Sequence, residues 1–138
     1  MYEQYLTSFW AIWLMVFTVI AQSLIATGAH RKQAQYVPGV VDEKLGHESF
    51  VFRSHRTFQN SLENVPLMLF TAFLAVLVGF SPVSLAVTTW IYAIARLLHM
   101  VLYYGIATEK NPSPRSYFYL IAMLSNVVLA VMIAVHLL

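Results

Sequence analysis

Two long stretches without a charged side chain constrain the fold of this 138-residue chain more than any other feature. Residues 6–29 carry no charge over 24 positions, and residues 64–95 carry none over 32 positions. About 20 apolar residues are enough for a helix to cross the ~30 Å hydrocarbon core of a bilayer. The longer stretch contains the turn-forming sequence GFSPVS at residues 79–84, so it predicts a hairpin of two membrane-spanning helices.

The composition is typical of an integral membrane protein, and the chain is too short for a second domain. The chain is 59% hydrophobic and 10% charged, whereas soluble domains carry about a quarter of charged residues. The mean hydropathy is +0.68. With a further apolar run at the C-terminal end, we predict an all-α membrane protein, a bundle of four transmembrane helices forming one domain over residues 1–138. The predicted spans are 6–29, from 49–51 to about 80, 83–105 and 116–138.

Several classes of function are disfavoured by the residue types present. The chain has no cysteine, so a Cys-based zinc site is excluded and any thiol chemistry must arrive with a ligand. No second ligand follows His55 or His99 at metal-binding spacing, so we expect no metal. A haem held by two histidines is conceivable but leaves the arginines unexplained. No basic run is interleaved with aromatic residues, so nucleic acid is not an expected partner.

The basic residues are distributed unevenly, which predicts an orientation. The turn at residues 79–84 has no Lys or Arg, whereas both longer polar loops are basic. By the positive-inside rule, both loops face the cytosol and both termini face away from it. The basic residues of the loops and their flanks are Arg31, Lys32, Lys44, Arg53, Arg56, Lys110 and Arg115.

A charged stripe precedes the second span. Arg53, Arg56, Asn60 and Glu63 follow one another at spacings of 3, 4 and 3, which places them on one side of a helix. Charged groups in a membrane helix are costly and indicate a functional site. The alternative is a helical extension into the cytosol whose charged stripe is simply solvated.

Polar residues on three helices are expected at one depth. With a rise of ~1.5 Å per residue, Arg96 lies about 20 Å and Glu63 about 26 Å from the outer end of the bundle. Guanidinium groups suit carboxylates or phosphates, and a carboxylate suits an amine. The predicted ligand is therefore a small zwitterion with more than one acid group, held against an apolar wall. The residues expected near this level are Glu63, Arg96, His99, Tyr103, Arg115 and Tyr119.

The sequence FRSHRTFQNSLENVP at residues 52–66 resembles the signature of the MAPEG family, the membrane-associated proteins in eicosanoid and glutathione metabolism. Its NSLENVP portion is most similar to the version found in microsomal glutathione transferases, and bacterial members of that type are the expected relatives. Further resemblances occur in the same order along nearly the whole chain. They are Arg31 after GAH, the pattern Arg96-x-x-His99-x-x-x-Tyr103, and Arg115, Ser116 and Tyr119 at the start of the fourth span.

The resemblance implies a homotrimeric enzyme in a bacterial inner membrane, with glutathione bound between subunits at the cytosolic side. Arg115 would stabilise the glutathione thiolate, and the product would form from a hydrophobic electrophile dissolved in the bilayer. A glutathione-dependent peroxidase activity is a related possibility. The residues expected to bind glutathione are Arg31, Arg53, Arg56, Asn60, Glu63, Arg96, His99, Tyr103, Ser116 and Tyr119.

Two further interpretations remain open at the level of sequence. The same arginines could serve a small membrane carrier or binding protein for organic anions, without any chemistry. A packing role with internally neutralised charges is disfavoured, because only one carboxylate, Glu63, accompanies Arg53, Arg56 and Arg96. Gln59 stands where several eicosanoid-producing members have an arginine, so the resemblance does not imply eicosanoid specificity.

Overall fold

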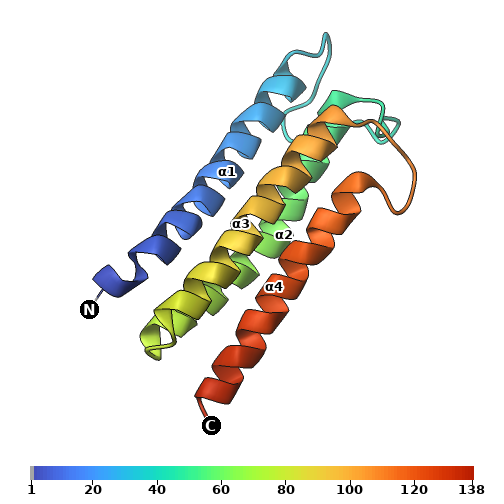
Figure 1. Cartoon of the computed structure of the whole chain (residues 1–138). Helices are drawn as coiled ribbons and strands as arrows, with labels where there is room; N and C mark the ends of the chain where they lie inside the picture. Colours follow the sequence, from blue (N-terminus) through green and yellow to red (C-terminus); the bar gives the residue numbers. More distant parts are fainter. Residues whose placement is uncertain (1) are drawn as a thin grey trace.

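The computed structural model describes residues 2–138 and consists of four long helices that run up and down in turn (Figure 1). All four are long and apolar enough to span a membrane, so the predicted all-α, four-helix membrane fold is confirmed. Their bounds lie close to the predicted ones, and the largest difference is that α2 ends at Leu77 and not near residue 80. The elements are η1 Glu3–Tyr5, α1 Leu6–Arg31, α2 Phe50–Leu77, α3 Pro82–Gly105 and α4 Pro114–His136.

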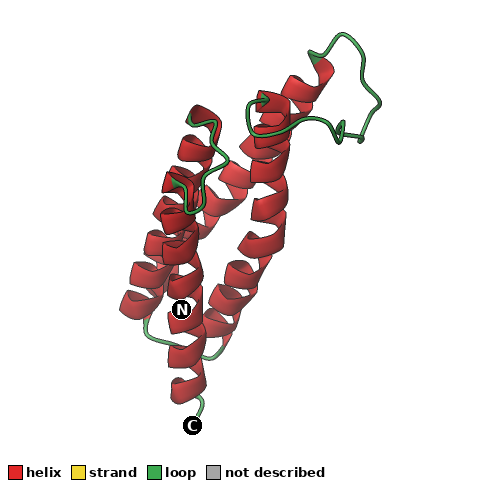
Figure 2. Cartoon of the chain, turned by 90° about the vertical axis from the view of Figure 1, so that its right-hand side faces the viewer, coloured by secondary structure: helices red, strands yellow, loops and turns green. Residues whose placement is uncertain are grey.

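One end of the bundle holds both termini and the tight turn between α2 and α3 (Figure 1). The Tyr5 hydroxyl donates a hydrogen bond of 2.7 Å to the carbonyl of Phe80, and His136 Nε2 lies 3.1 Å from the carbonyl of Val78. Gly79 adopts a φ of 67°, a left-handed conformation that glycine reaches without strain. The two polar loops, residues 32–49 and 106–113, lie at the opposite end (Figure 2).

The inner helices are α2 and α3, because each packs against all three other helices. The buried side of α2 is a stripe of mostly small residues at spacings of three and four. Small residues let neighbouring membrane helices approach closely. Two of the buried hydroxyls donate to backbone carbonyls within the helix, Ser54 to Val51 at 3.1 Å and Thr57 to Arg53 at 2.8 Å. The stripe comprises Ser54, Thr57, Ser61, Val65, Met68, Ala72 and Ala75.

Large apolar side chains cover the outside of the bundle. Phe70 and Leu77 are each 76% exposed, and Val83 is 73% exposed. A water-soluble protein would seldom expose such a continuous apolar surface, whereas lipid tails solvate it at no cost. The exposed surface therefore agrees with an integral membrane protein.

Candidate active site

An open cleft of about 360 Å³ lies between α2, α3 and α4, near the end of the bundle that carries the polar loops. Seven of the residues singled out from the sequence line it, although they are distributed over three helices. Two further lining residues come from the loop before α2 and from its first turn. The lining residues are His47, Phe52, Arg56, Asn60, His99, Tyr103, Arg115, Ser116 and Tyr119.

The contribution of α2 follows from how that helix is rotated. Arg56 and Asn60 each precede a residue of the buried stripe by one position, Thr57 and Ser61 respectively. One residue corresponds to a rotation of about 100° around a helix. The small hydroxyl residues therefore make the helix contact, and the long polar side chains emerge beside it, where the cleft opens.

Arg115 enters the cleft from the first turn of α4. Ser113 and Ser116 form a capping box, and Pro114 occupies the first helical turn, so the start of α4 is well defined. The guanidinium carbon of Arg115 lies 4.0 Å from the centroid of the Tyr103 ring, a cation–π contact. Ser116 is engaged in this cap, since its Oγ accepts a hydrogen bond of 3.1 Å from the backbone N–H of Ser113.

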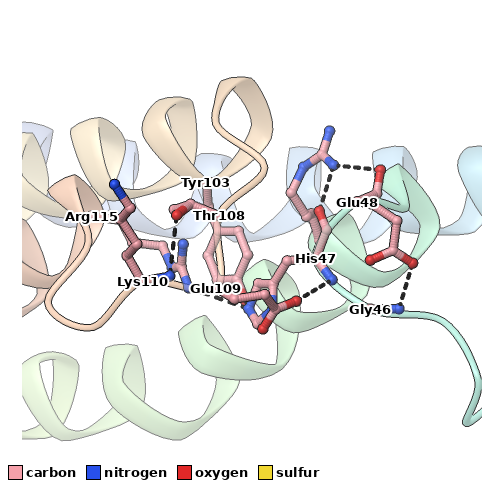
Figure 3. A network of polar contacts seen from close by, with 9 residues as sticks. Gly46, His47, Glu48, Tyr103, Thr108, Glu109, Lys110 and Arg115 are labelled. Carbon is pink, nitrogen blue, oxygen red and sulfur yellow. Dashed lines mark hydrogen bonds and ion pairs between the residues drawn. The ribbon is translucent and has the colours of Figure 1, made fainter.

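His47 connects the two polar loops to the cleft, and the sequence analysis did not single it out (Figure 3). Its Nε2 lies 3.0 Å from the Tyr103 hydroxyl and 3.2 Å from Nη2 of Arg115. Its Nδ1 lies 2.9 Å from Oε1 of Glu109, which also accepts a 3.1 Å bond from the His47 backbone N–H. Because a guanidinium only donates, Nε2 must be the acceptor toward Arg115, which leaves the proton on Nδ1.

Hydrogen bonds from His47 lower the pKa of Glu109. The side-chain bond is the larger cause, and the backbone bond adds to it. The carboxylate is therefore held in its charged form, facing the Nδ1–H of the ring. This arrangement fixes the tautomer of His47 and turns the lone pair of Nε2 toward Arg115 and Tyr103.

The cleft is positively charged, and some of the polar atoms of its lining residues have no partner among residues 2–138. Arg56 and Arg115 line it, and no Asp or Glu is among its lining residues in the described part of the chain. The start of α4 adds the positive end of a helix dipole. Asn60 Oδ1 and His99 Nδ1 are buried and lack a hydrogen-bond partner in the described part of the chain. Such a cleft suits an anionic ligand that also carries hydrogen-bonding groups.

A comparison with known protein families agrees with the four-helix membrane fold. The model of the MAPEG family matches residues 7–135, which covers nearly the whole chain. This chain belongs to the MAPEG family. No curated protein and no solved structure matches it. MAPEG proteins are membrane proteins of glutathione and eicosanoid metabolism, and they include glutathione transferases as well as members that bind without catalysis.

Two arginines expected at the site lie elsewhere in this MAPEG chain. Arg53 donates to the backbone carbonyls of His47, Glu48 and Tyr104 at 2.7, 3.0 and 3.3 Å, so it anchors the loop that presents His47. Arg31 lines a separate cavity of about 290 Å³ between the end of α1, the following loop and α2. Neither lines the cleft.

Glu63 and Arg96 also lie outside the cleft. Glu63 is exposed on the surface of α2 and forms no ion pair among residues 2–138. Arg96 is 3% exposed, and its Nη2 donates a 3.0 Å bond to Ser61 Oγ inside the bundle. The four residues of the charged stripe do lie in one helix, α2, as predicted. Their surroundings differ, however, because only Arg56 and Asn60 line the cleft.

Proposed function

We propose that this MAPEG protein is a membrane-bound glutathione transferase of the microsomal type, which conjugates glutathione to hydrophobic electrophiles dissolved in the bilayer. A glutathione-dependent peroxidase activity would use the same thiolate. The observation that carries the proposal is the position of Arg115, which extends over Tyr103 into a cleft lined by cations and by no carboxylate. Family membership supports the general class of activity.

The cleft has the polar groups that glutathione requires. Glutathione carries two carboxylates, one amine and two amide groups. Arg56 and Arg115 would bind carboxylate and thiolate charge, and the unpartnered Asn60 Oδ1 and His99 Nδ1 would bond to the polar groups of the tripeptide. The hydroxyls of Tyr103 and Tyr119 complete the polar lining.

Arg115 would activate the thiol. A neighbouring cation lowers the pKa of a thiol, which is about 8.5 when free, and the thiolate is the reactive nucleophile. The thiol proton leaves to solvent, the sulfur forms a bond to an electrophilic carbon, and the leaving group departs with the electron pair of the broken bond. The protein supplies orientation and charge stabilisation and forms no covalent intermediate of its own.

We further propose that the working unit is a homotrimer with glutathione bound between subunits. Glu63 motivates this proposal, because an exposed carboxylate without a partner is costly in a membrane helix. In the proposed assembly Glu63 would pair with the amine of glutathione and with nearby arginines, and Arg31 and Arg53 would complete the basic rim. The proposed location is a bacterial inner membrane with the sites at the cytosolic side, which the basic residues of both polar loops support.

The competing function is that of a carrier or binding protein for organic anions. Some MAPEG members bind without catalysis, and a cationic cleft alone does not distinguish the two functions. Purified protein in liposomes should consume glutathione in the presence of a hydrophobic aryl halide and release halide in equal amount. A carrier would bind glutathione and leave the thiol unreacted, and that result would overturn the proposed activity.

A further inference from the structure

The loop between α1 and α2 exposes a short apolar segment, YVPGVV at residues 36–41, which we call the apolar turn. Residues 36–40 are all exposed, and Tyr36, Val37 and Val40 are 45%, 61% and 59% exposed. Turns that face water are usually built from polar residues, and a run of exposed apolar residues needs a functional reason. The cleft does not supply that reason, because none of these residues lines it.

The apolar turn has a defined backbone conformation. The backbone N–H of Val40 donates a hydrogen bond of 3.1 Å to the carbonyl of Val37. Pro38 and Gly39 occupy the two central positions, and Gly39 has a φ of 78°, which is the pattern of a type II turn. The turn therefore holds Val37 and Val40 opposite one another as a bridged pair.

His30 attaches this turn to the last turn of α1. Its Nε2 lies 2.9 Å from the carbonyl of Val37, and because a carbonyl only accepts, Nε2 is the donor. Its Nδ1 is then the acceptor toward the Gln33 side chain at 3.3 Å. The imidazole also packs edge-on against the Tyr36 ring, with centroids 5.2 Å apart. The apolar turn is therefore fixed at the level where α1 ends.

The end of α1 marks the surface of the bilayer. The candidate span Glu3–Arg31 includes this helix, and its outward-facing Leu24 is 69% exposed. His30 follows Leu24 by about 9 Å along the helix axis. The loop after α1 projects sideways from the bundle instead of continuing along the helix axis (Figure 2). The apolar turn thus lies beside α1, where acyl chains give way to head groups.

An open hollow of about 400 Å³ beside the turn has an amphipathic lining. One side of it is formed by Tyr36, Val37 and Val40. The other side is polar and consists of Gln33, Gln35 and Asp42. Segments that lie in a membrane interface bury apolar side chains at the acyl boundary and keep polar groups among the head groups. The lining of the hollow matches such a boundary.

The opposite side of the turn faces the protein. Pro38, Gly39 and Val41 line the 290 Å³ cavity that contains Arg31, whereas Val37 and Val40 are not among the described residues that line it. The proposed intersubunit site includes Arg31 and so concerns this inner side. Val37 and Val40 belong to the outer side, which a lipid surface can cover.

We propose that the apolar turn, held by His30, inserts Val37 and Val40 into the head-group boundary of the bilayer beside α1. The contact is apolar and needs no anionic lipid, because residues 31–44 carry three cations and two carboxylates, a net charge of 3 − 2 = +1. The contact goes beyond the proposed transferase activity and does not depend on it, since it requires neither glutathione nor turnover.

Fluorescence quenching in phosphatidylcholine liposomes tests the proposal on the assembled protein. The chain has no cysteine, so Val37→Cys and Val40→Cys each provide a single attachment point for an environment-sensitive nitrobenzoxadiazole label. Phospholipids with a nitroxide near the top of the acyl chain should remove most of the fluorescence at both positions, and aqueous iodide should have little effect. Lys110→Cys, an exposed position in the other polar loop, is the control and should respond to iodide only.

Three other outcomes would overturn the proposal. A label that neither quencher reaches would show that a second copy of the chain covers the turn. A label that only iodide reaches would show that the turn is solvated. Nitroxide quenching that appears only after phosphatidylglycerol is added would show electrostatic attraction instead of apolar insertion.

Substitution of His30 tests the attachment of the turn. In the labelled Val40→Cys protein, His30→Phe keeps a ring beside Tyr36 but removes the donor to Val37. Quenching by the lipid nitroxide should therefore fall toward the value of the Lys110→Cys control. His136→Phe, at the other end of the bundle, should leave the quenching unchanged. Full lipid quenching in His30→Phe would overturn the proposed role of His30.

Discussion

The guanidinium carbon of Arg115 lies 4.0 Å from the centroid of the Tyr103 ring, and its Nη2 lies 3.2 Å from His47 Nε2. Tyr103 lies near the end of α3, and Arg115 lies in the first turn of α4. Their contact is therefore at the end of the cleft that faces the polar loops. The face of an aromatic ring and an imidazole nitrogen hold the guanidinium, and the Glu109 carboxylate lies beyond the imidazole. No carboxylate lines the cleft among the described residues, so the charge of Arg115 is available to a ligand there.

Replacement of Arg115 should separate binding from chemistry. Arg115→Ala should lower kcat by about 100-fold, because a positioned charge on a developing anion is worth that much in comparable sites. The affinity for glutathione should change less, since other polar side chains of the cleft also bind it in the proposed complex. Arg115→Lys should retain part of the activity, because lysine keeps the positive charge but lacks the planar guanidinium that can donate two parallel hydrogen bonds. The thiolate absorbance of bound glutathione near neutral pH gives the direct measurement.

Lys110 provides the matched control for Arg115. It is an exposed cation in the loop just before α4, and its side chain does not line the cleft. Lys110→Ala should leave the thiolate absorbance and kcat unchanged. If Arg115→Ala retains both the absorbance and normal turnover, Arg115 is not the activator, and Arg31 becomes the next candidate.

His47 should act through Arg115. His47→Phe preserves a ring that can stack on Tyr103, as His47 does with planes 15° apart, but it removes both nitrogens. The loss of a hydrogen bond to a charged group should lower kcat/KM by about tenfold. In the double variant with Arg115→Ala, the His47 substitution should have little further effect. Independent, multiplicative effects would show that His47 does not work by positioning Arg115.

Docking of the two polar loops should weaken in acid. The pKa of Glu109 is lowered in the folded state, chiefly by the side-chain hydrogen bond with His47. Its stabilising contribution is therefore complete above the ordinary carboxyl pKa and is lost as the pH falls through the lowered value. His47 and Arg115 are the charged or titratable groups that influence this carboxylate.

Hydrogen exchange at the His47 backbone N–H measures this docking, because that N–H donates to Glu109 at 3.1 Å. At neutral pH, exchange should be faster in Glu109→Gln than in the unsubstituted protein. The ratio of the two rates should approach one as the Glu109 carboxylate is protonated. A ratio that is independent of pH would remove Glu109 from the docking contact.

Glu63→Gln should weaken glutathione binding in the assembled protein by about tenfold, because buried or ligand-paired cations lose a nearby carboxylate. The substitution is nearly isosteric, and Glu63 is exposed in the protomer, so the fold of the single chain should be unaffected. Isothermal titration with glutathione measures the effect. Unchanged affinity in a folded variant would remove Glu63 from the site.

The proposed membrane orientation rests on the basic loops, both of which lie at the end of the bundle opposite the termini. A reporter that is active only outside the cytosol should therefore be active when fused after Leu138. A reporter that is active only in the cytosol should be inactive at the same position. The reverse result would overturn the orientation and move the cleft to the other side of the membrane.

Much of the architecture could be predicted from the sequence, because it depends on short-range properties. Length and the absence of charge predict four spans, and Pro82 and Pro114 mark the starts of α3 and α4 through their fixed φ. The fourth span was predicted to start at Ser116, because the polar sequence TEKNPSPR at residues 108–115 indicated a loop, whereas α4 begins at Pro114. In the structure, the Ser116 hydroxyl caps the helix that begins two residues earlier.

The sequence by itself determined the class of the protein and the helices that carry its polar residues. Only the tertiary structure decided which of these residues share a cleft. Spacing assigns Arg53, Arg56, Asn60 and Glu63 to one side of α2, but the rotation of that helix is set by how Thr57 and its neighbours pack. The closeness of His47 to residues 56 and 68 positions away depends on the folding of two loops, for which no sequence periodicity exists.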